Sequence, residues 1–153
     1  MRIKMSGYPL RISDKVVRSA AHFFARCLFS DKTRKNITVE INFVKGLIRT
    51  HKSFGDAVFV DRAWRPRHFE IRLDRNLGKS MMLRVLAHEL VHVQQWVNGR
   101  MVDLSDGRIR YCNKDWPSNS LNRKKQWELP WEREAIEKEQ FLLNLYVKHQ
   151  AKP

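Results

Sequence analysis

Two histidines and a glutamate stand close together in the segment His88-Glu89-Leu90-Val91-His92. The histidines are four positions apart, so on a helix both imidazoles project from one face, one turn apart. Imidazole nitrogen suits zinc, and catalytic zinc sites use three protein ligands and leave one position for water. A neighbouring carboxylate, here Glu89, can take a proton from a water that the metal makes more acidic. The spacing therefore predicts a zinc (Zn²⁺) site with His88 and His92 as ligands and Glu89 as general base.

A third ligand is expected from the segment Trp131-Glu132-Arg133-Glu134-Ala135, which begins the last predicted helix. The inward direction of that helix is defined by its apolar residues Ala135, Ile136, Leu142, Leu143 and Tyr146. At about 100° per residue, Glu132 lies roughly 35° from this direction and Glu134 roughly 125° from it. A carboxylate aimed at the core is costly unless a positive group meets it, and zinc would do so. Glu132 is therefore the predicted third ligand, and Glu134 is the alternative.

Other polar residues have weaker claims on the site. Glu139 also faces inward and could hold a ligand histidine from behind, although an exposed glutamate would read the same way. An oxyanion stabiliser is expected from Tyr111, Tyr146 or an arginine, without a basis for choosing among them. The remaining histidines are predicted to be surface or half-buried residues rather than ligands: His22, His51, His68 and His149.

The elements that must position these residues follow from periodicity. Helices are predicted over residues 14–29, 80–98 and 131–148, the first capped by Ser13 and the second stopped by Asn98-Gly99. Strands are predicted over 37–43, 58–60 and 69–73, and one of the last two is expected at the cleft edge, where an extended substrate could pair with it. Residues 100–130 indicate a loop with a short hairpin near 108–112. This order predicts an α+β domain with a small, mostly antiparallel sheet.

Composition narrows the class of protein. The 153 residues fit one domain, 1–153, and no run of 18 apolar residues suggests a membrane span. Two distant cysteines and an N-terminus without a secretory signal favour a cytoplasmic, reducing compartment. The net charge of +14 favours an acidic partner such as nucleic acid, or simply a basic surface.

The segment from Leu86 to Gln95, together with Pro130-Trp131-Glu132-Arg133-Glu134-Ala135, resembles the SprT-like and related small zincin metallopeptidases, including many from bacteriophages. The resemblance covers roughly residues 37 to 147. It implies a minimal zincin domain with one zinc and a protein or peptide substrate. The bacteriophage members also allow a virus-encoded protein that acts in the host cytoplasm. SprT proteins tend to use a third histidine soon after the motif, whereas no histidine lies between His92 and His149. The Glu-x-Glu-Ala pattern is more similar to glutamate-ligand zincins of the ImmA/IrrE type, whose ligand matches Glu132.

The sequence thus predicts a zinc-dependent peptidase. One alternative is a basic protein that associates with nucleic acid and holds a structural zinc, which four protein ligands would close. Another is a zincin fold that regulates a partner by binding it, without turnover.

Overall fold

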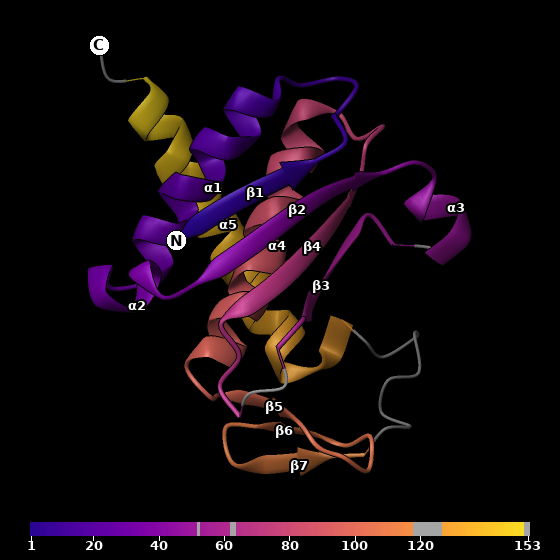
Figure 1. Cartoon of the computed structure of the whole chain (residues 1–153), viewed down its shortest axis with the longest axis vertical. Helices are drawn as coiled ribbons and strands as arrows, with labels where there is room; N and C mark the ends of the chain where they lie inside the picture. Colours follow the sequence, from indigo (N-terminus) through magenta and orange to yellow (C-terminus); the bar gives the residue numbers. More distant parts are fainter. Residues whose placement is uncertain (52, 62–63, 118–126, 152–153) are drawn as a thin grey trace.

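The computed structural model describes residues 1–51, 53–61, 64–117 and 127–151. In chain order its elements are β1 (Arg2–Ser6), α1 (Asp14–Leu28), α2 (Asp31–Lys35), β2 (Thr38–Val44), α3 (Leu47–His51), β3 (Gly55–Phe59), β4 (His68–Asp74), α4 (Lys79–Val97), β5 (Met101–Asp103), β6 (Ile109–Tyr111), β7 (Lys114–Trp116) and α5 (Pro130–Gln150). The chain is therefore α+β, and the three long helices and three of the strands lie close to where periodicity predicts them (Figure 1).

The main sheet has four strands in the order β1-β2-β4-β3. β2 pairs in parallel with β1 and with β4, and only β3 runs antiparallel to its neighbour β4. The prediction of a mostly antiparallel sheet is therefore wrong for the main sheet. The inward side chains alternate as expected, and Ile41 opposite Ile71 is the central buried pair.

Two features explain the parallel pairing. β1 was not predicted, because a five-residue strand with only Ile3 fully buried carries little periodic signal. The chain from β1 to β2 includes α1 and α2, which gives it the length that a parallel crossover requires. β3 then adds outside β4, so β2 and β4 become neighbours although β3 lies between them in sequence.

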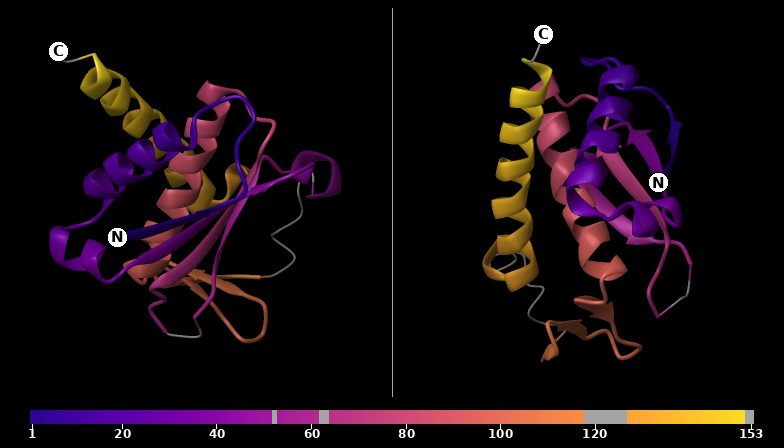
Figure 2. Two further views of the ribbon diagram at one scale, coloured as in Figure 1. Left: turned by 45° about the horizontal axis from the view of Figure 1, so that its top comes forward. Right: turned by 90° about the vertical axis from the view of Figure 1, so that its left-hand side faces the viewer.

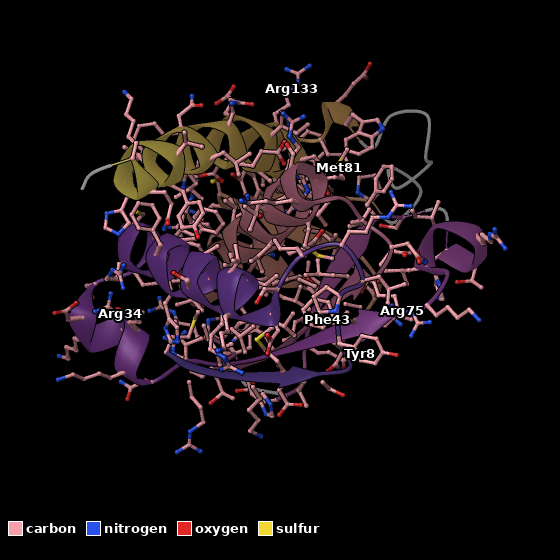
Figure 3. All side chains as sticks on the ribbon, turned by 90° about the horizontal axis from the view of Figure 1, so that it is seen from above. Tyr8, Arg34, Phe43, Arg75, Met81 and Arg133 are labelled. Atoms are coloured by element: carbon pink, nitrogen blue, oxygen red, sulfur yellow. The ribbon has the colours of Figure 1, made fainter. Side chains whose placement is uncertain are left out.

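The three long helices, α1, α4 and α5, cover one face of the sheet in two layers. α1 and α4 lie directly against the sheet, and α5 packs on the side of α4 away from it (Figure 2; Figure 3 from above). α4 is enclosed between sheet and α5, and most of its residues are buried, as expected for a helix that is apolar nearly all round. No helix within the described residues is long and apolar enough to cross a membrane.

The opposite face of the main sheet is polar. Glu40 on β2 accepts from Lys4 at 2.8 Å and lies 3.0 Å from the His68 ring, and Arg72 pairs with Asp56 at 2.5 Å. These cross-strand pairs leave the open face solvated rather than apolar.

A second sheet occupies the segment predicted as loop with a hairpin. β5, β6 and β7 form an antiparallel meander, so the predicted hairpin exists and gains a third strand. Cys112 and Asn113 make the turn between β6 and β7 with positive φ angles of 47° and 66°. Trp116 packs edge-on against Trp131 at 5.9 Å, which places this small sheet beside the first turn of α5.

Candidate metal centre

His88, His92 and Glu132 meet at the contact between α4 and α5. The two imidazole Nε2 atoms are 3.0 Å apart, and the Glu132 carboxylate oxygen lies 3.3 Å from one and 3.6 Å from the other. His88 and His92 lie on successive turns in the middle of α4, and Glu132 lies in the first turn of α5, which Pro130 begins. Among the described residues, this is the one group of three or more possible ligand side chains with the spacing of a metal site.

The triangle of donor atoms has the size of a zinc site. Tetrahedral coordination with bonds of about 2.0–2.1 Å separates ligand atoms by about 3.3–3.4 Å. The three atoms lie on a circle of radius about 1.9 Å, so a point just outside their plane is about 2.0–2.1 Å from all three. Two imidazole nitrogens and one carboxylate oxygen are also a ligand set that catalytic zinc uses. The residues present therefore fit a zinc ion.

Both histidines are held through the ring nitrogen that faces away from the triad. His88 Nδ1 donates to the Glu139 carboxylate at 2.9 Å, and His92 Nδ1 donates to the side-chain oxygen of Gln95 at 2.8 Å. A proton fixed on Nδ1 leaves the Nε2 lone pair of each ring pointing at the third residue, Glu132. Glu139 thus lies in the supporting position that its inward phase suggests.

Gln95 has no freedom to turn its amide. It is 1% exposed, and its nitrogen donates to the Trp131 carbonyl and to the Glu134 carboxylate, both at 2.9 Å. With both donors engaged, the amide oxygen must face His92 as acceptor. The supports of both histidines, like Glu132, therefore come from α5 or are fixed by it.

Glu134 lies outside the triad and is engaged elsewhere. It accepts from Arg100, Tyr111 and Lys138, the last at 2.8 Å, as well as from Gln95. Burial favours its neutral form, but these four donors outweigh burial and lower its pKa to about 2. The structure thus places Glu132 at the histidines and gives Glu134 an indirect link to His92 through Gln95.

Without a metal, the triad behaves as a buried network of opposite charges. Burial disfavours the His88 imidazolium, but hydrogen bonds to Glu132 and Glu139 prevail and raise its pKa to about 10. Burial likewise disfavours charged Glu132, but the hydrogen bonds from His88 and His92 prevail and lower its pKa to about 2. A dication in place of these protons would meet a carboxylate that is already ionised.

Glu89 lies beside the triad without belonging to it. It is buried, and no described side chain forms a hydrogen bond with its carboxylate. Burial raises its pKa, although the charges of His92 and His88 act in the opposite direction. A buried carboxylate with a raised pKa beside a group that could hold a metal ion is suited to accepting and returning a proton.

The other residues considered from the sequence lie elsewhere. Tyr111 donates to Glu134, and Tyr146 packs against Phe23 and Phe24 between α1 and α5. His68 contacts Glu40, and His149 stacks on Phe23 at 4.9 Å. The segment Asn122-Arg123-Lys124-Lys125, which adds three basic residues to the net charge, lies outside the described residues.

Sequence reasoning missed Gln95. The available signal was an amide three positions after a predicted ligand, on a stretch of helix otherwise filled with apolar side chains. Its partners could not be foreseen, because the contact between α4 and α5 that supplies them is not local.

Comparisons of the chain with protein family models, with curated proteins and with solved structures give no match. The resemblance to small zincins therefore rests on the motif residues alone. The structure itself supports a coarser statement: the chain has a possible metal triad formed by two helices.

Proposed function

We propose that the protein is a zinc-dependent peptidase of the zincin type. The observation that carries the proposal is the triangle of His88, His92 and Glu132 donor atoms, with the size of a tetrahedral zinc site, beside the buried carboxylate of Glu89. Bound zinc supplies Lewis acidity: it makes a water molecule more acidic and polarises a carbonyl oxygen. The resemblance of the motifs to SprT-like and glutamate-ligand zincins agrees with this choice.

Glu89 is the residue that moves protons. Its carboxylate takes a proton from the attacking water and returns it to the leaving nitrogen of the peptide. Glu139 and Gln95 keep the two imidazoles in the orientation that ligation needs.

A peptide substrate is supported by the free edge of β3. β3 is the last strand of the main sheet, and its outer edge pairs with no other described strand. Val58 and Val60 are 44% and 51% exposed, so this edge and the chain that follows it present apolar side chains to solvent. An extended peptide can add to such an edge through backbone hydrogen bonds, which do not depend on the amino-acid sequence of the peptide.

Metal analysis and one substitution test the proposal. The purified protein should hold about one zinc per chain, and a His88→Ala, His92→Ala variant should hold almost none. Glu89→Gln should keep the zinc and lose at least about 100-fold of the rate at which unfolded protein substrates are cut. Iron in place of zinc, or full activity in Glu89→Gln, would contradict the proposal.

Binding of nucleic acid is a second candidate function, favoured by the distribution of charge. Residues 1–35 contain nine lysines and arginines against two aspartates, a net charge of +7 and half of the chain's +14. They form β1, α1 and α2, which lie at one end of the main sheet, with Arg34 labelled there in Figure 3. The described part of this region exposes no large apolar side chain after Leu10. Such a surface suits a phosphate backbone better than a membrane, which requires apolar anchors.

A matched pair of charge variants tests this second function. Changing Lys15, Arg26, Lys32 and Lys35 to glutamine should weaken binding of a 20-nucleotide single strand at least about tenfold and reduce the salt dependence. The control changes four exposed cations elsewhere, Lys45, Arg49, Arg133 and Lys148, to glutamine. Equal losses in both variants would show non-specific attraction instead of a binding surface.

A further inference from the structure

An apolar groove of about 610 Å³ lies just beyond the candidate metal centre. Its walls come from three places: the end of β3 and the chain after it (Phe59, Trp64, Pro66), the last turn of α4 (Trp96), and residues 101–105 of β5 and its continuation. We call this the aromatic groove. Its volume falls within the range of sites that hold small molecules.

Trp96 lines the aromatic groove and lies next to the candidate metal centre. Trp96 follows His92 by one helical turn, and the centres of the two rings are 6.3 Å apart. Phe59 meets the same indole edge-on at 5.7 Å. The indole nitrogen of Trp96 donates to Asp103 at 3.1 Å, which fixes the wall that β5 contributes.

β3 runs along α4, the helix that carries His88 and His92, and ends at this groove. At its start Gly55 lies against Val85 of α4, one turn before Glu89. At its end Phe59 packs on Trp96, one turn after His92. β3 therefore runs beside α4 in the same direction, and an extended peptide on its free edge would pass Glu89 before reaching the groove.

We propose that the aromatic groove binds one large apolar side chain, aromatic or long aliphatic, of a peptide substrate. This inference rests on the proposed peptidase function and adds its specificity. Trp96 follows Glu89 by seven residues on α4, about 10.5 Å along the helix axis. At about 3.3 Å per residue of an extended chain, the bound side chain lies about two to four residues from the bond that is cut. Of the described residues that line the groove, only Asp103 is charged, and it is already paired with Trp96, so an uncharged side chain fits best.

Peptide binding can be measured separately from cleavage. Zinc-loaded Glu89→Gln protein is titrated with an alanine-based ten-residue peptide carrying one central phenylalanine, and with the same peptide carrying glycine there. The indole N–H resonances of Trp64 and Trp96, assigned with Trp→Phe variants, should shift with the phenylalanine peptide and not with the glycine peptide.

Two matched variants locate the site. Trp64 is 69% exposed and Phe141, on the outside of α5, is 62% exposed, so either can be changed to alanine without disturbing the core. Trp64→Ala should weaken binding of the phenylalanine peptide about tenfold, and Phe141→Ala should leave it unchanged. Equal affinity for the two peptides, or equal losses of affinity in the two variants, would contradict the proposal that the aromatic groove binds the apolar side chain.

Cleavage of a random peptide library by the wild-type protein separates this inference from the proposed function. Large apolar residues should be enriched at one fixed position relative to the cut, and Trp64→Ala should remove that enrichment. Cleavage without enrichment would contradict side-chain binding in the groove but agree with the peptidase function. Binding of the phenylalanine peptide at Trp64 and Trp96 without any cleavage would support the groove and contradict the peptidase.

Discussion

Two glutamates of one helical turn have different partners at the candidate metal centre. Glu132 places an oxygen within 3.6 Å of both histidine nitrogens, whereas Glu134 joins Arg100, Lys138 and Tyr111 and reaches His92 only through Gln95. Glu132 is positioned as a ligand, whereas Glu134 holds Gln95, the residue that orients His92.

Alanine substitutions should separate the two tasks. Glu132→Ala should lower zinc affinity at least about 100-fold, because it removes a donor atom from the triad. Glu134→Ala should cost about tenfold or less, because it only loosens the amide that orients His92. Competition with a chelating dye measures both. A larger loss in Glu134→Ala than in Glu132→Ala would contradict this assignment.

At the scale of elements, the contact between β3 and α4 places the edge strand of the main sheet beside the helix that carries His88 and His92. Gly55 makes this contact possible, because a Cβ atom there would lie 2.5 Å from Val85 Cγ1 and 2.9 Å from the Arg72 carbonyl oxygen. The glycine is needed for close approach rather than for an unusual φ angle.

Gly55→Ala should therefore destabilise the protein by about 1–3 kcal/mol, since the strand must move away from the helix. Thermal unfolding would show this as a fall in Tm of about 2–4 °C per kcal/mol. The matched control is Gly78→Ala, where an added Cβ meets nothing within 4 Å, and its cost should stay below about 1 kcal/mol. Similar losses in both variants would show that packing at β3 is not the cause.

What could be predicted from the sequence differs between elements. Helix α4 and the inward phase of Glu132 follow from local periodicity, and the structure places both as expected. The parallel pairing of β1, β2 and β4 depends on contacts between residues 30 to 36 positions apart, which periodicity does not contain. Glu139 was predicted as a possible support of His88, whereas the Gln95 support of His92 and the aromatic groove were missed for the same reason. Gln95, Phe59 and Trp96 acquire their partners only when α5, β3 and β5 pack on α4.

At the scale of the whole molecule, stability without metal depends on the charged triad. The His88 pKa of about 10 exceeds its ordinary 6.5, so its contribution is complete below pH 6.5 and is lost as the pH rises towards 10. The Glu132 pKa of about 2 is below its ordinary 4.5, so its contribution is complete above pH 4.5 and is lost as the pH falls towards 2. The metal-free protein should therefore be most stable between about pH 4.5 and 6.5, as urea unfolding can measure.

Zinc affinity should rise with pH above neutrality, where the stability of the metal-free protein falls. Below pH 10 the metal must displace the proton of His88, so affinity should rise about tenfold per pH unit for each proton released. Titration calorimetry in buffers of different ionisation enthalpy counts those protons. Zinc uptake without proton release at pH 7 would contradict the charged state assigned to His88.

Because Glu132 and Glu139 both lie on α5, this helix fixes the distance between the two carboxylates that contact His88. The two carboxylates are seven residues apart, two turns and about 10.5 Å along the axis, and both must reach His88. One residue inserted between them would rotate one carboxylate by about 100° relative to the other and separate ligation from support. The first ten residues of α5 therefore tolerate substitutions on the outer face but no change of register at the site, whereas the later turns are constrained by packing, such as that of Tyr146 against Phe23 and Phe24.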